Sequence, residues 1–176
     1  LSTFAPSVPT WLHGTLMAGN YKTPLIYVNV KAVFTNTVPV DAYRGAGRPE
    51  AIYTLERVMD RAARELGMDP LELRRRNFIK PDQFPYDTPV GETYDVGDFD
   101  KVLRRAEAEA DLAGFAARKA ADEAAGRMRG LGLCYYIESI LGDPAETAKV
   151  EFAADGRVLI YVGTQSNGQG HETVYA

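Results

Sequence analysis

The sequence is poor in the features that mark secreted, membrane-bound or nucleic-acid-binding proteins. A single cysteine, Cys134, among 176 residues excludes an internal disulfide and is typical of a reducing compartment, so we expect a cytoplasmic protein. No apolar run approaches the roughly 20 residues that a membrane-spanning helix needs, which predicts no membrane partner. A net charge of -4 offers no positive excess for nucleic acid. Cys134 lies in an apolar stretch, which favours an inert core thiol over a nucleophile.

The chain also lacks an initiator methionine and a basic leader. We therefore expect no signal peptide, and an end within a motif at residues 175–176 predicts a piece of a larger protein. The composition, with 45% hydrophobic and 25% charged residues, is that of an ordinary globular protein. The length is sufficient for a hydrophobic core.

Turn and capping signals divide the chain into the helices and strands of an α/β (α+β) fold. Apolar residues at helical spacing after Pro49 predict a long helix that ends at Gly67. The Asp155-Gly156 turn between two β-rich runs is the strongest hairpin signal in the chain. The expected elements are helices at 9–19, 50–66, 70–78, 99–110 and 112–125, strands at 25–34 and 131–137, and a hairpin of 148–153 with 157–162. Residues 80–97, rich in proline and glycine, indicate an irregular connection.

Two polar features have a structural interpretation that is simpler than a functional one. Arg74, Arg75 and Arg76 form the one basic cluster, and a solvated helix face or pairs with local carboxylates explain it better than an anion site does. His13 is alone within its expected helix. We therefore place no ligand site at either position.

The stretch Val40–Glu50 is the first candidate ligand site. It lies between the expected strand at 25–34 and the long helix, and residues 42–50 read Ala-Tyr-Arg-Gly-Ala-Gly-Arg-Pro-Glu. Gly45 and Gly47 allow the backbone to approach a ligand closely, and the N–H groups at the start of the helix favour an anion. Gly-x-Gly before a helix is, however, more often a simple tight turn. We name residues 42–50 the arginine loop.

The stretch Gly163–Glu172 is the second candidate and follows the hairpin. It places Gln169 between Gly168 and Gly170. A glutamine amide offers an acceptor and two donors to the edge of a heterocycle, and glycines let backbone N–H groups reach a phosphate. The alternative is a polar loop whose glycines serve turn geometry alone. We name residues 163–172 the glutamine loop.

The two loops in this order resemble a known family. The arginine loop is similar to that of the molybdenum-binding large subunit of the xanthine oxidase, aldehyde oxidase and aerobic carbon monoxide dehydrogenase family. The glutamine loop is similar to the Gly-Gln-Gly loop that holds the pterin cofactor in that family. The segment 71–78, Leu-Glu-Leu-Arg-Arg-Arg-Asn-Phe, follows the first long helix in the expected order. The resemblance covers essentially the whole chain and implies strand–loop–helix units of a molybdopterin-binding region, followed by a β-hairpin.

The resemblance implies which residues bind the cofactor. Arg44 corresponds to the arginine that lies against the molybdopterin, with Gly45 beside it. Gln169 corresponds to the glutamine that hydrogen-bonds the cofactor, between Gly168 and Gly170.

The resemblance also bears on the substrate. Ala46 stands where xanthine-type enzymes carry a phenylalanine that holds an aromatic substrate, so a purine is disfavoured. Gly45 stands where true carbon monoxide oxidisers carry the cysteine that bridges copper to molybdenum, so no copper bridge can form. Glu138, placed by counting back from the hairpin, is a further candidate for the substrate pocket.

The intact enzyme that the resemblance implies uses molybdopterin with molybdenum, in its cytosine dinucleotide form, and carries 2Fe-2S and FAD on partner subunits. We expect the chain to contact the iron–sulfur and flavin subunits and the remainder of the large chain, to serve a small-molecule substrate, and to belong to a homo-oligomer. The base glutamate and a glycine-rich loop of the family lie outside these residues. We therefore assign no catalytic residue and no metal ligand to the chain, and expect the isolated fragment to be inactive.

The expected domain organisation follows the same resemblance. Residues 1–97 form the end of a first molybdopterin-binding domain, and residues 98–176 form a helical connection and the start of a second. The alternative is a stand-alone binding or interaction module that keeps the fold without molybdenum. A glycine-rich loop encoded upstream would favour the enzyme, and a stop codon after Ala176 would favour the module.

Overall fold

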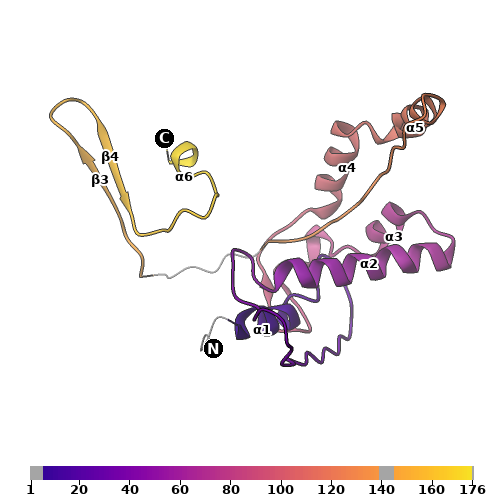
Figure 1. Cartoon of the computed structure of the whole chain (residues 1–176), viewed down its shortest axis with the longest axis horizontal. Helices are drawn as coiled ribbons and strands as arrows, with labels where there is room; N and C mark the ends of the chain where they lie inside the picture. Colours follow the sequence, from indigo (N-terminus) through magenta and orange to yellow (C-terminus); the bar gives the residue numbers. More distant parts are fainter. Residues whose placement is uncertain (1–5, 139–144, 176) are drawn as a thin grey trace. The chain divides into compact units, whose positions relative to one another are not determined.

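The chain divides into two compact units, Leu1–Ile137 and Glu138–Ala176. The computed structural model describes residues 6–138 and 145–175, and Figure 1 shows their elements in chain order. The first unit contains the helices α1 (Ser7–Thr15), α2 (Arg48–Leu66), α3 (Pro70–Asn77), α4 (Phe99–Glu109) and α5 (Phe115–Ala124), the short turns η1 (Pro81–Gln83) and η2 (Leu112–Gly114), and the strands β1 (Tyr86–Asp87) and β2 (Thr93–Tyr94). The second contains β3 (Ala148–Phe152), β4 (Val158–Val162) and α6 (His171–Val174). This mixture confirms the predicted fold class. None of the helices in the described part is long and apolar enough to cross a membrane.

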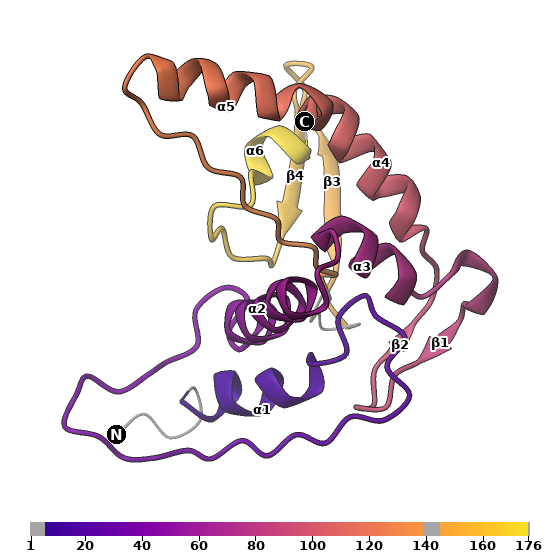
Figure 2. The same cartoon turned by 90° about the vertical axis from the view of Figure 1, so that its right-hand side faces the viewer.

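The long helix α2 is the centre of the first unit. It begins after Gly47 (φ 84°) and ends at Gly67 (φ 61°), both in the left-handed region that glycine adopts without strain. Figure 2 shows α1 and α3 beside α2. The start of α3 follows the predicted rule, because the Asp69 carboxylate accepts hydrogen bonds from the N–H groups of Leu71 and Glu72 at 2.9 Å.

An aromatic core joins α2, α3 and α4 in the first unit. Phe78 is buried at its centre, and its ring lies 4.9 Å from that of Tyr135 and 6.0 Å from that of Phe99, between ring centroids. These separations are typical of favourable aromatic pairs. The other buried members of the cluster are Tyr21, Ile79, Tyr94 and Leu103. The irregular connection predicted at 80–97 contributes to this core through β2, which pairs with β1 in a two-residue antiparallel ladder.

Two predicted strands are absent from the described residues. Residues 25–34 run extended but pair with no other strand in the described part of the chain, and residues 131–137 do likewise. A strand needs a neighbour to satisfy its N–H and C=O groups, and alternation in the sequence does not supply one. Instead, the N–H of Tyr135 donates to the Glu56 carboxylate at 2.9 Å, and its hydroxyl donates to the Phe99 carbonyl at 2.6 Å.

Two further predictions in the first unit were wrong in detail. Helix α1 ends at Thr15 and not at Gly19, and Trp11 on it is 64% exposed, so the expected apolar face is incomplete. Cys134 is exposed and not a core thiol. Partial burial, with the Glu56 charge adding to it, nevertheless raises the pKa of the thiol and so disfavours the thiolate.

The second unit confirms the predicted hairpin. Strands β3 and β4 pair antiparallel around Asp155-Gly156, and Gly156 adopts φ 83° in the turn. The register pairs Val150 with Ile160 and Phe152 with Val158, so these four apolar side chains share one face of the ladder. All four are exposed. The strand β4 leads directly into the glutamine loop.

Candidate functional site

The arginine loop is a turn fixed by two glycines of different character. The N–H of Arg48 donates to the Gly45 carbonyl at 2.9 Å, which closes the turn before α2. A Cβ on Gly47 would lie 2.6 Å from the carbonyl oxygen of Pro9 and 2.8 Å from the backbone nitrogen of His13, so this glycine packs directly on α1. A Cβ on Gly45 would meet nothing within 4 Å. The loop is therefore anchored at Gly47 and open at Gly45.

Two side chains lie at the open end of the loop. Arg44 is exposed at the start of the turn, and Ala46 is half-buried behind it. The Asp41 carboxylate accepts a hydrogen bond from the Ala42 N–H at 2.7 Å. The turn thus presents a guanidinium beside a strip of backbone that carries no side chain at Gly45. That combination suits an anionic or planar ligand.

A buried charge cluster that the sequence interpretation missed lies two turns along α2. The Glu56 carboxylate accepts from the Tyr21 hydroxyl at 2.5 Å, from Arg74 Nε at 3.0 Å and Nη2 at 2.9 Å, and from the Tyr135 N–H. Arg74 is completely buried and also donates to Asp60 at 2.9 Å. Burial, with the hydrogen bond and charge of Glu56 adding to it, raises the pKa of Tyr21 far above its ordinary value.

This cluster confirms the predicted pairing of the three arginines with carboxylates and shows what signal was available for the buried one. All three arginines of the basic cluster do pair with carboxylates, Arg75 with Asp100 and Glu107, and Arg76 with Glu72. Arg74, however, is a core residue and does not belong to a solvated face. The position of Glu56, four residues after Ile52 and three before Met59, places it on the apolar face of α2 by helical spacing. A charge at such a position needs a buried partner.

The glutamine loop holds its own central side chain in place. The Gln169 amide oxygen accepts from the Asn167 N–H at 2.5 Å, and its nitrogen donates to the Gln165 carbonyl at 2.8 Å. An amide has two N–H donors and two acceptor lone pairs, so one of each is left for a ligand. Gly168 (φ 85°) and Gly170 (φ 79°) flank it in the left-handed region, and a Cβ on Gly170 would meet nothing within 4 Å.

The predicted site residues therefore fall into two groups. Arg44, Gly45 and Ala46 share one turn of the first unit, whereas residues 168–170 share one turn of the second. Glu138 is the first residue of the second unit and is exposed. Within residues 6–138 and 145–175, no three His, Cys, Asp or Glu side chains gather as metal ligands. The two loops instead offer N–H groups, a guanidinium and an amide, a donor set that suits the phosphate and ring edge of an organic cofactor.

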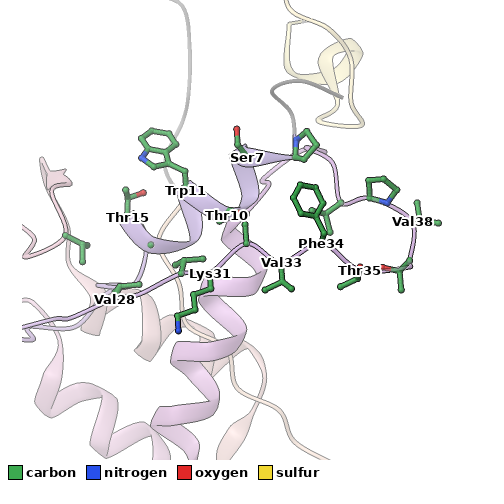
Figure 3. Close-up of a pocket in the computed structure, with 18 residues that line it drawn as sticks. Ser7, Thr10, Trp11, Thr15, Val28, Lys31, Val33, Phe34, Thr35 and Val38 are labelled. Atoms are coloured by element: carbon green, nitrogen blue, oxygen red, sulfur yellow. Dashed lines mark hydrogen bonds between the residues drawn. The ribbon is translucent and has the colours of Figure 1, made fainter. Parts of the chain in front are cut away.

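An open groove of about 1060 Å³ lies elsewhere in the first unit and contains none of the predicted site residues. Figure 3 shows α1 on one side of it and the extended segment from Val28 to Val38 on the other. Its lining is mainly valine, threonine and proline, and Lys31 adds a positive charge. Such a lining lacks the convergent polar groups of a catalytic pocket.

Comparison with known proteins identifies both loops as parts of matched regions. A family model described as a molybdopterin cofactor-binding domain matches residues 1–78, which contain the arginine loop. A second model with the same description matches residues 105–176, which contain the glutamine loop. Among curated proteins, the carbon monoxide dehydrogenase large chain of Hydrogenophaga pseudoflava is 33% identical over 92% of this chain and 22% of its own length. The 6-hydroxypseudooxynicotine dehydrogenase complex subunit gamma of Paenarthrobacter nicotinovorans is 36% identical over 92% of this chain and 21% of its own.

Solved structures agree with these matches. A structure of quinoline 2-oxidoreductase from Pseudomonas putida 86 has a TM-score of 0.80 and 31% identity, and covers 98% of this chain and 23% of that one. A structure of a Cu,Mo-CO dehydrogenase has a TM-score of 0.72 and 32% identity over 90% of this chain. The chain thus spans about a fifth of the length of the relatives that it matches.

Proposed function

Since this chain belongs to the xanthine oxidase, aldehyde oxidase and carbon monoxide dehydrogenase family of molybdenum-binding large subunits, we propose that its two loops hold the molybdopterin cofactor of an intact molybdenum hydroxylase. The observation that carries the proposal is the pair of loops itself. Each lies in a region matched by a molybdopterin cofactor-binding model, and each presents a glycine whose missing Cβ leaves open space. No observation favours the alternative of a stand-alone module.

The residues of the chain have separate tasks in this proposal. Arg44 lies against the pterin and donates charge-assisted hydrogen bonds. Gln169 uses its remaining N–H and lone pair on the cofactor, while Gly45, Gly168 and Gly170 let the backbone approach it. When bound, the cofactor supplies the redox chemistry of substrate oxidation, and the protein orients and encloses it.

The substrate proposal rests on what the arginine loop lacks. Ala46 offers no aromatic wall, which disfavours a purine, and we propose a small substrate that Ala46 and Glu138 border. Gly45 has no thiolate with which to hold copper beside molybdenum. Oxidation of carbon monoxide by a copper-bridged centre is therefore not part of this proposal.

The further organisation is proposed from the relatives. We propose the cytosine dinucleotide form of the cofactor and separate subunits that carry 2Fe-2S and FAD, in a cytoplasmic homo-oligomeric complex. The printed names of relatives, a large chain and a complex subunit gamma, support a multi-subunit assembly. We also propose a boundary between the two cofactor-binding domains near residue 97, which lies in the interval 79–104 between the matched regions.

The experiment is an Arg44→Lys substitution in the full-length large subunit, with molybdenum per chain measured beside the melting temperature. A lysine keeps the charge but loses the planar fork, so we expect lower molybdenum occupancy at an unchanged melting temperature. Arg61→Lys is the matched control, because Arg61 lies exposed on α2 and pairs only along its own helix, with Glu65. Full occupancy in the Arg44 variant would contradict the proposal.

A second variant tests the substrate pocket. Ala46→Phe should create a flat apolar wall worth about 1 kcal/mol to an aromatic substrate. We expect kcat/KM to shift toward heteroaromatic substrates at the expense of bulky aldehydes. An unchanged preference would remove Ala46 from the pocket.

A further inference from the structure

Arg48 stands out within the arginine loop because it points inward. It is the first residue of α2, and only 7% of its surface is exposed, whereas Arg44 in the same turn is exposed. Its Nη1 donates a hydrogen bond to the carbonyl of Ile137 at 3.2 Å. Its charge also lies close enough to the Tyr94 hydroxyl to oppose the rise in the pKa of that phenol, which burial dominates and brings to about 12. The Arg48 side chain is therefore packed inside the first unit and does not face solvent with Arg44.

The partner of Arg48 is the last residue of the first unit. Ile137 ends that unit, and Glu138 begins the next. The segment that leads to this point has no strand to pair with in the described part of the chain, so its contacts with α2 hold it. Glu56 accepts from the Tyr135 N–H, and Arg48 donates to the Ile137 carbonyl, two residues later. These two hydrogen bonds, together with that from the Tyr135 hydroxyl to the Phe99 carbonyl, hold a segment that pairs with no strand in the described part of the chain.

We propose that Arg48 is a positioning residue that fixes where the chain leaves the first unit relative to the arginine loop. The inference rests on the proposed function and deepens it. Arg48 follows the turn that carries Arg44 directly in the chain. Its guanidinium donates a hydrogen bond to the Ile137 carbonyl, in the peptide that precedes Glu138. The positions of Ala46, in the same turn, and of the Ile137 peptide, which leads to Glu138, then depend on Arg48.

The chemistry of arginine suits this task. A rigid guanidinium on a buried stem delivers its donor in a fixed direction, whereas a lysine ammonium is a flexible point charge that can reach a single acceptor. Lysine at this position should therefore still donate a hydrogen bond to the Ile137 carbonyl, although a less well oriented one. Methionine has a similar apolar stem but no donor, so it should form no such hydrogen bond. Arg61→Met is the matched control, because it removes the same charge from an exposed position of the same helix.

The experiment compares Arg48→Met, Arg48→Lys and Arg61→Met in the full-length large subunit of the assembled enzyme. Hydrogen exchange of the Tyr135 amide, which donates to Glu56 two residues before the Ile137 carbonyl, is the readout that does not depend on turnover. Losing a hydrogen bond from a charged donor should loosen the segment and raise the exchange of the Tyr135 amide about tenfold in Arg48→Met, with α2 unchanged, and less in Arg48→Lys. The KM for substrate should rise several-fold, with a smaller change in kcat, because the pocket is misplaced and not dismantled.

The outcomes separate this inference from the function on which it rests. Wild-type exchange of the Tyr135 amide in Arg48→Met would overturn the positioning role, as would equally faster exchange along the whole of α2, which is the sign of a general loss of stability. An Arg48→Lys variant no better than Arg48→Met would overturn it too. A wild-type subunit without molybdenum would contradict the proposed function, while the exchange data would still decide on Arg48.

Discussion

Glu56→Gln is the substitution that most directly tests how the first unit is held together. Glutamine keeps the shape of the side chain but loses its charge, and its NH₂ group replaces one acceptor by a donor. The carboxylate now receives four hydrogen bonds from Tyr21, Arg74 and Tyr135. The variant would leave the completely buried Arg74 with Asp60 as its remaining carboxylate partner.

The expected loss can be worked out from this geometry. Removing one partner of a buried ion pair costs about 3–5 kcal/mol, because the other charge stays buried without full compensation. An exposed pair on the same helix, Arg61–Glu65, should contribute only about 0.3–0.5 kcal/mol. With a urea m-value of about 2 kcal/mol/M, the unfolding midpoint of Glu56→Gln should fall by roughly 2 M, and that of the Glu65→Gln control by less than about 0.3 M.

Urea unfolding followed by circular dichroism at 222 nm is the assay, because the long helices all belong to the first unit. A double-mutant cycle with Arg74→Met completes it. The double variant should be more stable than the sum of the two single losses predicts, since neither charge then remains buried alone. A midpoint for Glu56→Gln within the range of the Glu65 control would refute the reasoning.

Burial raises the pKa of Tyr21, Tyr94 and Tyr135 above the ordinary 10.0, and that of Tyr94 and Tyr135 to about 12. The contribution of Tyr94 and Tyr135 to stability is therefore complete below pH 10 and is lost as pH rises through about 12, and that of Tyr21 is lost at still higher pH. A phenolate titration at 295 nm that finds every tyrosine ionised by pH 11 in the folded state would contradict this. Gly47→Ala should destabilise the chain by more than Gly45→Ala does, because both strain a positive φ but only the first forces a Cβ against α1. Equal urea midpoints would argue against that anchor. The isolated chain should self-associate through its exposed apolar surface and should not oxidise any aldehyde or heteroaromatic. A clean monomer in light scattering would contradict the expected self-association. Turnover above that of a metal-free control would contradict the expected inactivity.

Local signals in the sequence were sufficient for the end of α2, the start of α3 and the hairpin. Gly67 and Asp69 act through bonds to residues at most four positions away, and the Asp155-Gly156 turn pairs strands that are adjacent in the chain. Such features depend on neighbours that the sequence itself supplies. They were predicted correctly for that reason.

Non-local partners were not visible in the same way. The alternation at residues 25–34 predicts a strand, but it does not say which strand pairs with it, and the described residues contain none. Helical spacing placed Leu66 on the apolar face of α2, yet it is 65% exposed, while Glu56 on that face is buried. The contact of Glu56 with Arg74 spans 18 residues and depends on the angle between two helices. Composition and periodicity carry no information on that angle.

The candidate site shows the same division at the level of single residues. The motif predicted that Gly45 and Gly47 would sit in a turn before a helix, and both do, with positive φ. It did not distinguish their tasks, because only the structure shows Gly47 pressed against the Pro9 carbonyl and Gly45 facing open space. The assignment of Arg44 and Gln169 to the cofactor stays a prediction.

Arg44 is exposed and Arg48 is buried, so one short turn can be held in place and still present a side chain to a ligand. A ligand loop that was free to move would lose conformational entropy on binding, at a cost that falls on the affinity. In this chain the loop is already ordered before a ligand binds, because Gly47 packs on α1 and Arg48 donates a hydrogen bond to the Ile137 carbonyl. The exposed residues between these anchors need little further ordering. A loss of cofactor affinity in Arg48→Met with Arg44 intact, larger than the change in melting temperature explains, is therefore the result that this arrangement predicts.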